Sequence, residues 1–255
     1  MSVSMQSDKY QLGSVDRSLE ILSILAATPR LRLAELSAQL QANPSTVLRA
    51  LRVLERHGLV RRASSELEYV LGARLVELGQ AAVASIDIVQ ELRSPLRSLS
   101  ADFNATAHLG MVREGMVTVL EKIDPPRPIV GYSAVGSRMP LHATAVGKAA
   151  LALGGTGLLP ANSGLHSYTV HTITDTAELA TDLAQTVQRR YSVEREEYHN
   201  GFGCVGSAVR IGSDIYAVSI SGSLTSEDEL RVRGETLRNF VHDVTGSYQG
   251  AAQNL

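Results

Sequence analysis

The segment from Leu33 to Arg62 restricts the fold of this chain more than any other, because its pattern predicts two short helices, a tight connection and a strand. Asn43 stands where a side chain can cap a helix, and Pro44 has the backbone angle of a first helical position. We therefore expect a helix from Pro44 that ends before a left-handed Gly58. The preceding helix carries leucines at core spacing, so the two helices can pack at a steep angle.

The helix from Pro44 has an apolar side and a cationic side. At roughly 100° per residue, the apolar side consists of Val47, Ala50, Leu51 and Leu54. The stripe nearly opposite consists of Ser45, Arg49, Arg52 and Arg56. From Arg30 to Arg62 the chain carries seven arginines and two acidic residues, a balance of +5 in a chain of net charge −2. A solvated charged face is the ordinary alternative, but this concentration favours a DNA-binding helix-turn-helix.

The flanking segments supply the rest of such a module. A first helix should start at Ser14 or Asp16, with one apolar face formed by Val15, Leu19, Leu22, Leu25 and Ala26. After the recognition helix, residues 59–62 and 67–71 predict two strands around a turn at 63–66. A basic hairpin in this place is typical of a wing, whose arginines can reach phosphate or the minor groove. An ordinary surface hairpin is the alternative.

Charge and composition divide the chain into two parts with different partners. Residues 1–72 have a charge balance of +2 and the remainder has −4, so affinity for nucleic acid must come from a local patch. At 255 residues and 44% hydrophobic content, the chain can form two domains. The single cysteine, Cys204, excludes an intramolecular disulfide and fits a reducing compartment. Because no signal-like or membrane-spanning apolar run is present, we expect a cytoplasmic protein without membrane contact.

Beyond residue 72 the pattern changes to mixed helices and strands. A linking helix should begin at Arg74, and another should follow with Asp87 as N-cap and a kink or break at Pro95. Strands are expected at residues 107–112, 116–123, 129–132, 191–195, 204–210 and 215–221. Helices are expected from about Ala143 to Leu153, from Thr174 with Leu179, Leu183 and Val187 inward, and after a capping box of Ser226 and Glu229. This order predicts a mainly antiparallel sheet with helices packed on it.

Three motifs suggest an enzyme, and each lacks the context that the chemistry needs. Gly201–Gly206 fits G-x-G-x-x-G but leads into a strand, where a dinucleotide fold needs a helix. Gly147-Lys148 resembles the end of a P-loop without its first glycine or its serine or threonine. Cys204 lacks an evident orienting carboxylate for a nucleophile. The histidines of this half show no metal-ligand spacing; they are His142, His166, His171 and His199. We therefore expect no catalytic residue, metal or cofactor.

The helix expected near Ala143 offers a different kind of site. The first-turn N–H groups of Thr144, Ala145 and Val146 have no partner within the helix and lie at the positive end of its dipole. They can therefore receive a small carboxylate. Capping by His142 or by water is the alternative.

Several motifs together resemble the IclR family of bacterial transcription regulators over nearly the whole chain. The matching segments are Ser14–Leu22, Leu33–Arg62, Tyr69–Gly72, Pro140–Lys148, Arg195–Glu197 with Gly201 and Cys204, and Val218–Gly222. The resemblance implies an α+β multidomain chain with an N-terminal winged helix-turn-helix, a linker helix and a C-terminal GAF-like mixed α/β effector domain. It also implies a homodimer that often pairs into a dimer of dimers.

The resemblance also places an effector pocket. Carried over by position, the pocket falls on Met139, Ala145, Val146, Glu194, Cys204, Ser219 and Ser221, with Gly131 as a further position. Glu194 stands where the family often has aspartate. Its longer side chain narrows the pocket and its charge opposes a second carboxylate, so it more readily accepts a hydrogen bond from a ligand hydroxyl.

These observations predict a ligand-responsive DNA-binding transcription regulator, a repressor or an activator, and not an enzyme. The expected effector is a small organic acid, such as a hydroxylated or aromatic carboxylate, and the expected DNA is a palindromic operator. Base contacts are assigned to Ser45, Thr46 and Arg49, and phosphate contacts to Arg52, Arg56, Arg61 and Arg62. The alternative is a small-molecule-binding or enzymatic domain with a vestigial DNA-binding module.

The expected domain limits follow from the same patterns. We expect a flexible N-terminus at 1–13, a DNA-binding domain at 14–73, a linker helix at 74–90 and an effector domain at 91–255.

Overall fold

A computed structural model of the chain describes residues 13–64, 67–127, 133–160 and 164–252. The chain divides into two compact units, Met1–Ser85 and Ile86–Leu255. Within the described ranges, no helix combines the length and the apolar content that crossing a bilayer requires. The strand expected at 129–132 and the pocket position Gly131 lie outside the described residues.

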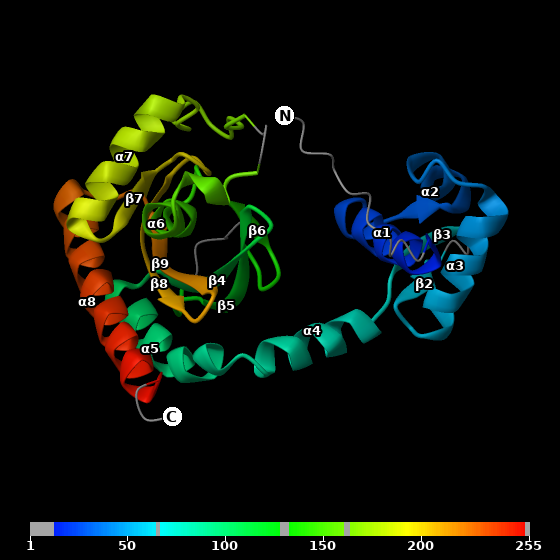
Figure 1. Cartoon of the computed structure of the whole chain (residues 1–255), viewed down its shortest axis with the longest axis horizontal. Coiled ribbons are helices and arrows are strands. Elements are labelled where there is room, and N and C mark those ends of the chain that lie inside the picture. The colour runs from blue at the N-terminus through cyan, green and yellow to red at the C-terminus, as the bar shows by residue number, and fades with distance from the viewer. Residues whose placement is uncertain (1–12, 65–66, 128–132, 161–163, 253–255) are drawn as a thin grey trace, which may run out of the picture. The chain divides into compact units, whose positions relative to one another are not determined.

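The first unit is a three-helix core with a small antiparallel sheet (Figure 1). Its elements are α1 Gly13–Ala27, β1 Leu31–Arg32, α2 Leu33–Gln39, α3 Pro44–Arg56, β2 Val60–Arg62, β3 Glu68–Leu71 and α4 Arg74–Ala84. The strands lie in the order β1-β3-β2. Ile21, Leu36 and Leu51, one from each helix, are fully buried in the hydrophobic core that the three helices share. The predicted winged helix-turn-helix is confirmed, whereas the two-residue strand β1 was too short to show any alternation in the sequence.

Helix α3 begins and ends where the sequence predicts. Pro44 is its first residue, and Gly58 has a left-handed φ of 70° just after it. Asn43 occupies the N-cap position, but its side chain makes no capping hydrogen bond, so that part of the prediction is wrong. On α2, a Glu35 carboxylate oxygen accepts a hydrogen bond from the backbone N–H of Arg32 at 2.6 Å, which closes the start of that helix.

The face predicted for α1 is largely wrong. Val15 and Leu19 are 52% and 57% exposed, whereas Leu25, as predicted, and Ile21, which was not predicted, are buried. The helix packs against α3 and β3 through a stripe that starts one turn later than expected. Its first turns therefore carry apolar side chains to the surface of the unit.

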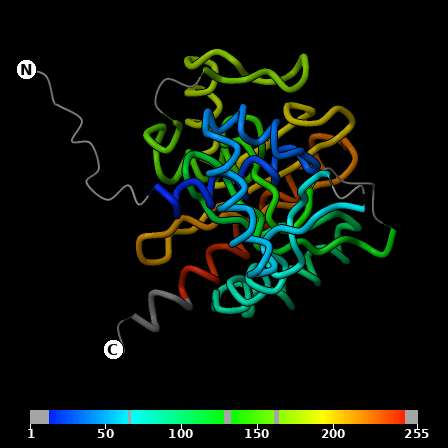
Figure 2. The backbone as a smooth tube through the Cα atoms, turned by 90° about the vertical axis from the view of Figure 1, so that its right-hand side faces the viewer, coloured from blue at the N-terminus to red at the C-terminus, as the bar shows by residue number. Residues whose placement is uncertain are grey.

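The second unit is a six-stranded antiparallel sheet that curls around one helix (Figures 1 and 2). Its elements are α5 Asp87–Phe103, β4 Thr106–Arg113, β5 Met116–Ile123, β6 Arg138–Pro140, α6 Ala145–Gly154, the 3-10 helix η1 Thr156–Leu158, α7 Thr176–Arg189, β7 Ser192–Arg195, β8 Phe202–Ile211, β9 Asp214–Ser223 and α8 Glu227–Ala252. The strand order is β6-β5-β4-β9-β8-β7. Helix α6 lies inside the curl with α7 packed on it, while α5 and α8 cover the outer face. The expected antiparallel sheet with helices packed on it is confirmed.

Hairpin and helix boundaries in this unit follow local chemistry. The turn between β4 and β5 has positive φ at Glu114 and Gly115, which matches the predicted hairpin. Asp175 caps α7 by accepting hydrogen bonds at 2.9 Å from the next two free N–H groups, so the helix starts two residues later than expected. Val187 was predicted to point inward but is 57% exposed, because the buried stripe continues through Thr186.

For α5 the predicted N-cap is wrong, and of the kink or break expected at Pro95 the break is absent. Asp87 is the first helical residue and Ile86 occupies the N-cap position. Pro95 does not break the helix, which continues from Asp87 to Phe103. The carbonyl that loses its partner at Pro95 belongs to Glu91, an exposed residue, so water can satisfy it.

The capping box expected before α8 is half present. Ser226 Oγ accepts a hydrogen bond from Glu229 N at 3.3 Å. The Glu229 carboxylate accepts hydrogen bonds from Thr225 and Arg233 instead of closing the box. Arg233 is nearly buried, and its ion pair draws the acidic side chain away from the helix start.

Candidate functional site

Helix α3 presents the predicted cationic stripe to solvent. Val47, Leu51 and Leu54 are buried on its other side. Ser45, Arg49, Arg52 and Arg56 are exposed, and Thr46 is half-buried. Among the described residues, Arg49, Arg52 and Arg56 form no ion pair. Their charges are therefore available to a polyanion.

The wing arginines differ from each other. The guanidinium of Arg62 lies 5.1 Å from the Tyr69 ring centre, and its Nη2 donates a hydrogen bond to the Tyr69 hydroxyl at 3.0 Å. Its Nε also lies 3.8 Å from a Glu55 carboxylate oxygen on α3. Arg62 thus braces the wing against α3, while Arg61 is exposed beside it. The sequence gives no sign of this brace, because Tyr69 and Glu55 join it only through the fold.

The polar residues of the second unit gather on the inner face of the sheet. Strand register places Glu194, Cys204 and Ser221 in one row across β7, β8 and β9. The neighbouring row consists of Ser192, Gly206, Ser219 and His108. Three of the residues carried over by resemblance therefore share a row, and Ser219 adjoins them, although no local motif connects them.

The start of α6 rests directly on the second of these rows. A Cβ added to Gly206 would lie 2.4 Å from the Ala145 carbonyl oxygen, so only glycine allows this approach. Ser192 Oγ donates a hydrogen bond to the same carbonyl at 2.6 Å. The first residues of α6, Ala145 and Val146, are both buried against the sheet.

The N-cap of α6 is Thr144, and the helix starts two residues later than predicted. Thr144 Oγ1 accepts a hydrogen bond from Gly147 N at 3.1 Å and donates one to the Pro140 carbonyl at 2.7 Å. His142 does not cap the helix, because its Nε2 lies 2.9 Å from the His166 carbonyl. Thr144 thus drops out of the predicted anion-receiving group. The amides of Ala145 and Val146 remain at the positive end of the helix.

Glu194 lies at the edge of this face and is almost completely buried. Burial raises the pKa of its carboxyl group to about 7, despite a hydrogen bond from Cys204 and two from backbone N–H groups. Its Oε1 accepts from Glu197 N at 2.6 Å and from Tyr198 N at 3.3 Å. The side chain is therefore partly protonated near neutral pH and can either donate or accept one further hydrogen bond.

The raised pKa of Glu194 predicts a pH-dependent effect of Glu194→Gln on stability. Between the ordinary carboxyl pKa and about 7, the folded chain retains a proton that the unfolded chain releases, so rising pH destabilises the wild type. Glutamine cannot ionise. The variant should gain up to about 3 kcal/mol of unfolding free energy relative to wild type as pH rises from 5 to 8. Urea unfolding at both pH values measures this, and a pH-independent difference would contradict it.

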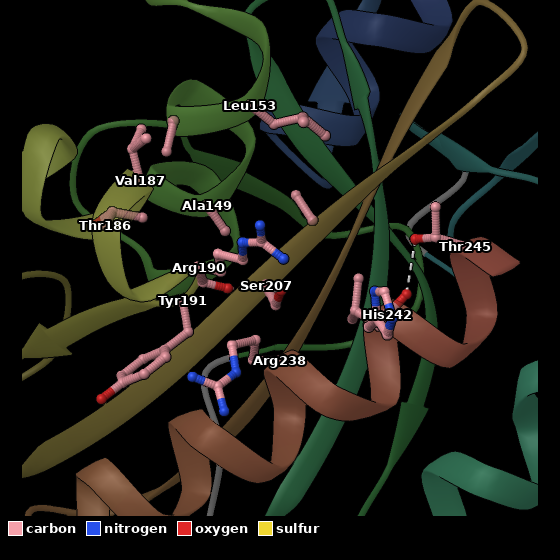
Figure 3. Close-up of a pocket in the computed structure, with 13 residues that line it drawn as sticks. Ala149, Leu153, Thr186, Val187, Arg190, Tyr191, Ser207, Arg238, His242 and Thr245 are labelled. Atoms are coloured by element: carbon pink, nitrogen blue, oxygen red, sulfur yellow. Dashed lines mark hydrogen bonds between the residues drawn. The ribbon is translucent and has the colours of Figure 1, made fainter.

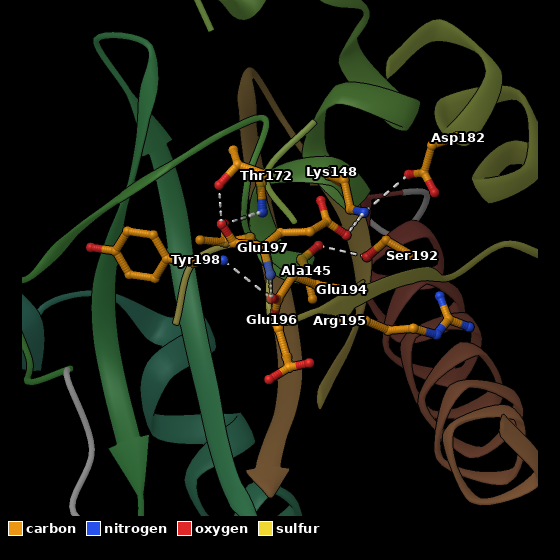
Figure 4. A network of polar contacts seen from close by, with 12 residues as sticks. Ala145, Lys148, Thr172, Asp182, Ser192, Glu194, Arg195, Glu196, Glu197 and Tyr198 are labelled. Atoms are coloured by element: carbon orange, nitrogen blue, oxygen red, sulfur yellow. Dashed lines mark hydrogen bonds and ion pairs between the residues drawn. The ribbon is translucent and has the colours of Figure 1, made fainter. Parts of the chain in front are cut away.

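A buried ion cluster holds the segment that follows Glu194 (Figure 4). Lys148 on α6 is fully buried, with its Nζ 2.6 Å from Glu197 Oε1 and 3.2 Å from Asp182 Oδ2 on α7. Thr172 Oγ1 donates a hydrogen bond to the Glu197 carbonyl at 2.5 Å. Burial raises the pKa of Glu197, while Lys148 opposes that shift. The cluster fixes the Glu197 backbone N–H that Glu194 binds.

His108 is a functional candidate that sequence reasoning missed. It is buried on β4, with Nε2 2.8 Å from Ser133 Oγ and Nδ1 3.4 Å from Ser219 Oγ. Burial lowers its pKa to about 4, with Lys122 nearby adding to the shift, so the ring is neutral at pH 7. The available signal was an ionisable residue inside the apolar strand predicted at 107–112.

Two other predicted positions, and one of the histidines that show no metal-ligand spacing, have different surroundings. Met139 lies on β6, at the opposite edge of the sheet from β7, in a hydrophobic cluster that includes Val146. Cys204, the single cysteine of the chain, is buried. His171 lies 3.8 Å from a Glu196 carboxylate. Across the described ranges, no three His, Cys, Asp or Glu side chains come together as a metal site would require.

Comparisons with known proteins identify the family. The family model described as "Bacterial transcriptional regulator IclR C-terminal" matches residues 80–246, and the model "IclR helix-turn-helix domain" matches residues 14–64. The chain belongs to the IclR family. It is an HTH-type transcriptional regulator, in agreement with the exposed arginines of α3.

Individual IclR-family proteins match over most of their length. The chain is 35% identical to the HTH-type transcriptional regulator XynR of Escherichia coli, over 90% of this chain and 91% of that protein. It is 33% identical to the HTH-type transcriptional regulator KdgR of Dickeya chrysanthemi, over 91% of this chain and 77% of that protein. An IclR regulator structure from Alicyclobacillus acidocaldarius superposes with a TM-score of 0.79 at 25% identity, covering 93% of this chain and 99% of that chain. These relatives are named as regulators, not enzymes.

Proposed function

We propose that this regulator responds to a small organic acid bound on the inner face of the sheet, where α6 begins. One observation carries the proposal: Gly206, which touches Ala145, lies directly opposite Ser219 in the sheet. The amides at the positive end of α6 therefore lie next to the row of Ser219, and the Ser221 hydroxyl lies in the adjacent row. A carboxylate can bind the amides, while the hydroxyls donate to its second oxygen.

The other groups on this face favour a hydroxylated or aromatic acid. Partly protonated Glu194 can accept a hydrogen bond from a ligand hydroxyl, and neutral His108 adds no charge. Tyr168 packs its ring against His142, which precedes α6, and against Tyr198, with ring centres 5.9 and 4.9 Å apart. This aromatic cluster provides flat surfaces beside the site.

The first probe for the site is 4-hydroxybenzoate, together with a panel of small carboxylates. An IclR homolog from Microbacterium hydrocarbonoxydans has been solved in complex with that compound; at 20% identity, its TM-score of 0.69 supports a shared fold alone. A thermal-shift screen selects the acid that stabilises this chain, since a ligand that binds the folded state raises the melting temperature.

Replacing Ser219 and Ser221 together with alanine should abolish the effector response and spare DNA binding. The double variant removes the hydroxyls but keeps the strand, whose pairing uses backbone groups. Fluorescence anisotropy on operator DNA, with and without the selected acid, measures both properties. Ser223→Ala, at the exposed end of the same strand, is the matched control. An unchanged effector response in the double variant would refute the pocket.

We propose residues 14–73 as the DNA-binding domain, 74–90 as the linker and 91–255 as the effector domain. On α3, Ser45, Thr46 and Arg49 are the proposed base contacts, and Arg52 and Arg56 are proposed to bind phosphate. Arg61 is the proposed wing contact. Arg62 keeps a phosphate role only in addition to bracing the wing, because Tyr69 and Glu55 already engage it.

We also propose a homodimer, or a dimer of dimers, on a palindromic operator. No residue of helix α4 is buried in the described chain. Its apolar side chains Val76 and Leu78 are 62% and 47% exposed. Because residues two apart point to different sides of a helix, a second copy that packs on either side of α4 can cover one of these side chains and set the spacing of paired α3 helices. Val76→Glu with Leu78→Glu should therefore shift the sedimentation profile toward monomer, and Glu91→Gln should not. An unchanged profile would exclude α4 from the interface.

A further inference from the structure

A separate cavity of about 340 Å³ lies between α6, α7, β8 and α8 (Figure 3). Its apolar wall includes Ala149 and Leu153 of α6, Val187 of α7 and Val241 of α8. None of the described residues assigned to the effector site lines it. Its volume falls in the range of small-molecule sites, and most of its wall is apolar, as such sites usually are.

Two arginines reach this cavity from different elements. Arg190 follows the end of α7, and Arg238 comes from α8, with His242 one turn further along that helix (Figure 3). No acidic residue lines the cavity, and neither arginine has an ion pair within the described ranges. Arg238 Nε donates a hydrogen bond to the neutral side-chain amide of Asn239, whose Oδ1 lies 3.2 Å away. Two guanidinium groups beside an apolar wall favour an organic anion.

The backbone at Arg190 is held in an uncommon conformation. Its φ is 62°, in the left-handed region that favours glycine at the end of a helix. Its N–H donates a hydrogen bond to the Thr186 carbonyl at 2.8 Å, and its carbonyl accepts one from Ser207 Oγ at 3.1 Å. These two hydrogen bonds fix the position of the Arg190 backbone at the border of the cavity.

Thr186 supplies an independent sign of a missing partner. Its side chain lines the cavity and is 2% exposed, yet its hydroxyl has no hydrogen-bond partner among the described residues. A threonine on a helix commonly bonds the carbonyl one turn earlier, as Thr181 does on the same helix. A buried hydroxyl without a partner indicates that the cavity holds a ligand that can accept a hydrogen bond from it.

We propose that this cavity is a second ligand site, which takes an amphipathic organic anion. The apolar body would lie against Ala149, Leu153 and Val241. The anionic group would lie between Arg190 and Arg238, within reach of the Thr186 hydroxyl. The site would not depend on the effector pocket, because the two share no assigned residue.

The absence of tryptophan in this chain provides a direct test. Leu153→Trp introduces a single indole at the rim of the cavity, where Leu153 is 44% exposed. Titration of the full-length variant with sodium octanoate should give a saturable change in fluorescence. Octanamide has the same apolar chain without the charge and should bind at least about tenfold more weakly. Equal affinity for the two compounds, or no saturable response to octanoate, would overturn the proposal.

Charge variants in the Leu153→Trp background locate the binding site. Arg238→Gln should weaken octanoate binding by about tenfold or more. Arg231→Gln removes an exposed arginine of the same helix outside the cavity and should have no effect. If Arg238→Gln alters the melting temperature, Arg190→Gln serves as the second variant, because its side chain is exposed. Unchanged affinity in the arginine variants would overturn the proposal.

The double serine variant distinguishes binding in this cavity from binding in the effector pocket. Ser219→Ala with Ser221→Ala should leave the octanoate response of Leu153→Trp intact. If that pair of substitutions removes the response, octanoate is bound in the effector pocket, and the second site is refuted.

Discussion

Replacement of Lys148 with methionine should lower the free energy of unfolding by about 3–5 kcal/mol, because it leaves the buried Glu197 carboxylate without its cation and leaves half-buried Asp182 with only the more distant Arg189. Lys148 is fully buried, and Glu197 is nearly so. Glu197 Oε2 and Asp182 Oδ2 have no hydrogen-bond partner in the described chain, so Lys148 is the main compensation for their charge. Urea unfolding at pH 7 measures the loss.

Two further variants make this prediction specific. Adding Glu197→Gln to Lys148→Met removes one uncompensated charge and should recover part of the lost stability. Arg231→Met, which breaks exposed ion pairs with Asp228 and Glu235, should change stability little. A loss for Lys148→Met no larger than that of Arg231→Met would contradict the role assigned to the cluster. Lys148→Met should also weaken effector binding, because the backbone N–H of Glu197 donates the hydrogen bond that positions the Glu194 carboxylate.

Arg49→Ala should weaken specific operator binding by about 1–3 kcal/mol if Arg49 contacts a base edge. Arg49 is exposed near the start of α3 and forms no ion pair within the described ranges, so the substitution removes little from the fold. Anisotropy titrations on operator and unrelated DNA distinguish two outcomes. A loss on the operator alone indicates base contact, and an equal loss on both indicates phosphate contact.

Arg97→Ala is the matched control for this measurement. Arg97 is an exposed arginine of α5 in the other unit, so its replacement changes the net charge equally. Its operator affinity should equal that of the wild type. Unchanged affinity in Arg49→Ala would remove Arg49 from the proposed recognition surface.

Local signals in the sequence predicted the recognition helix well. Pro44 and Gly58 mark its ends through their own backbone preferences, and the spacing of Val47, Leu51 and Leu54 defines its buried side. The same reasoning failed for α1. There several apolar stripes were available, and contact with α3 and β3 selected Ile21 and Leu25.

The ligand face was predictable only in part. Ser219 and Ser221 share a strand face by alternation, and the resemblance supplied Glu194 and Cys204. The buried lysine cluster could not be predicted, because Lys148 is 34 and 49 residues away from its two carboxylate partners in sequence. In sequence Gly147-Lys148 resembles only the end of a P-loop, whereas in the structure Lys148 neutralises carboxylates from α7 and from the segment after β7. Likewise, the cavity at Arg190 requires four elements to meet.

We propose that an acid bound in the second unit changes the affinity of the first unit for DNA. The most direct test is anisotropy of the upstream intergenic DNA at two salt concentrations, with and without the acid selected by thermal shift. The wild type should bind in a salt-sensitive, sequence-preferring manner, with an affinity that the acid changes. The double variant Ser219→Ala with Ser221→Ala should bind the DNA with the wild-type affinity, and the acid should not change that affinity. Absence of sequence-preferring binding, or an identical acid response in both proteins, would contradict the account.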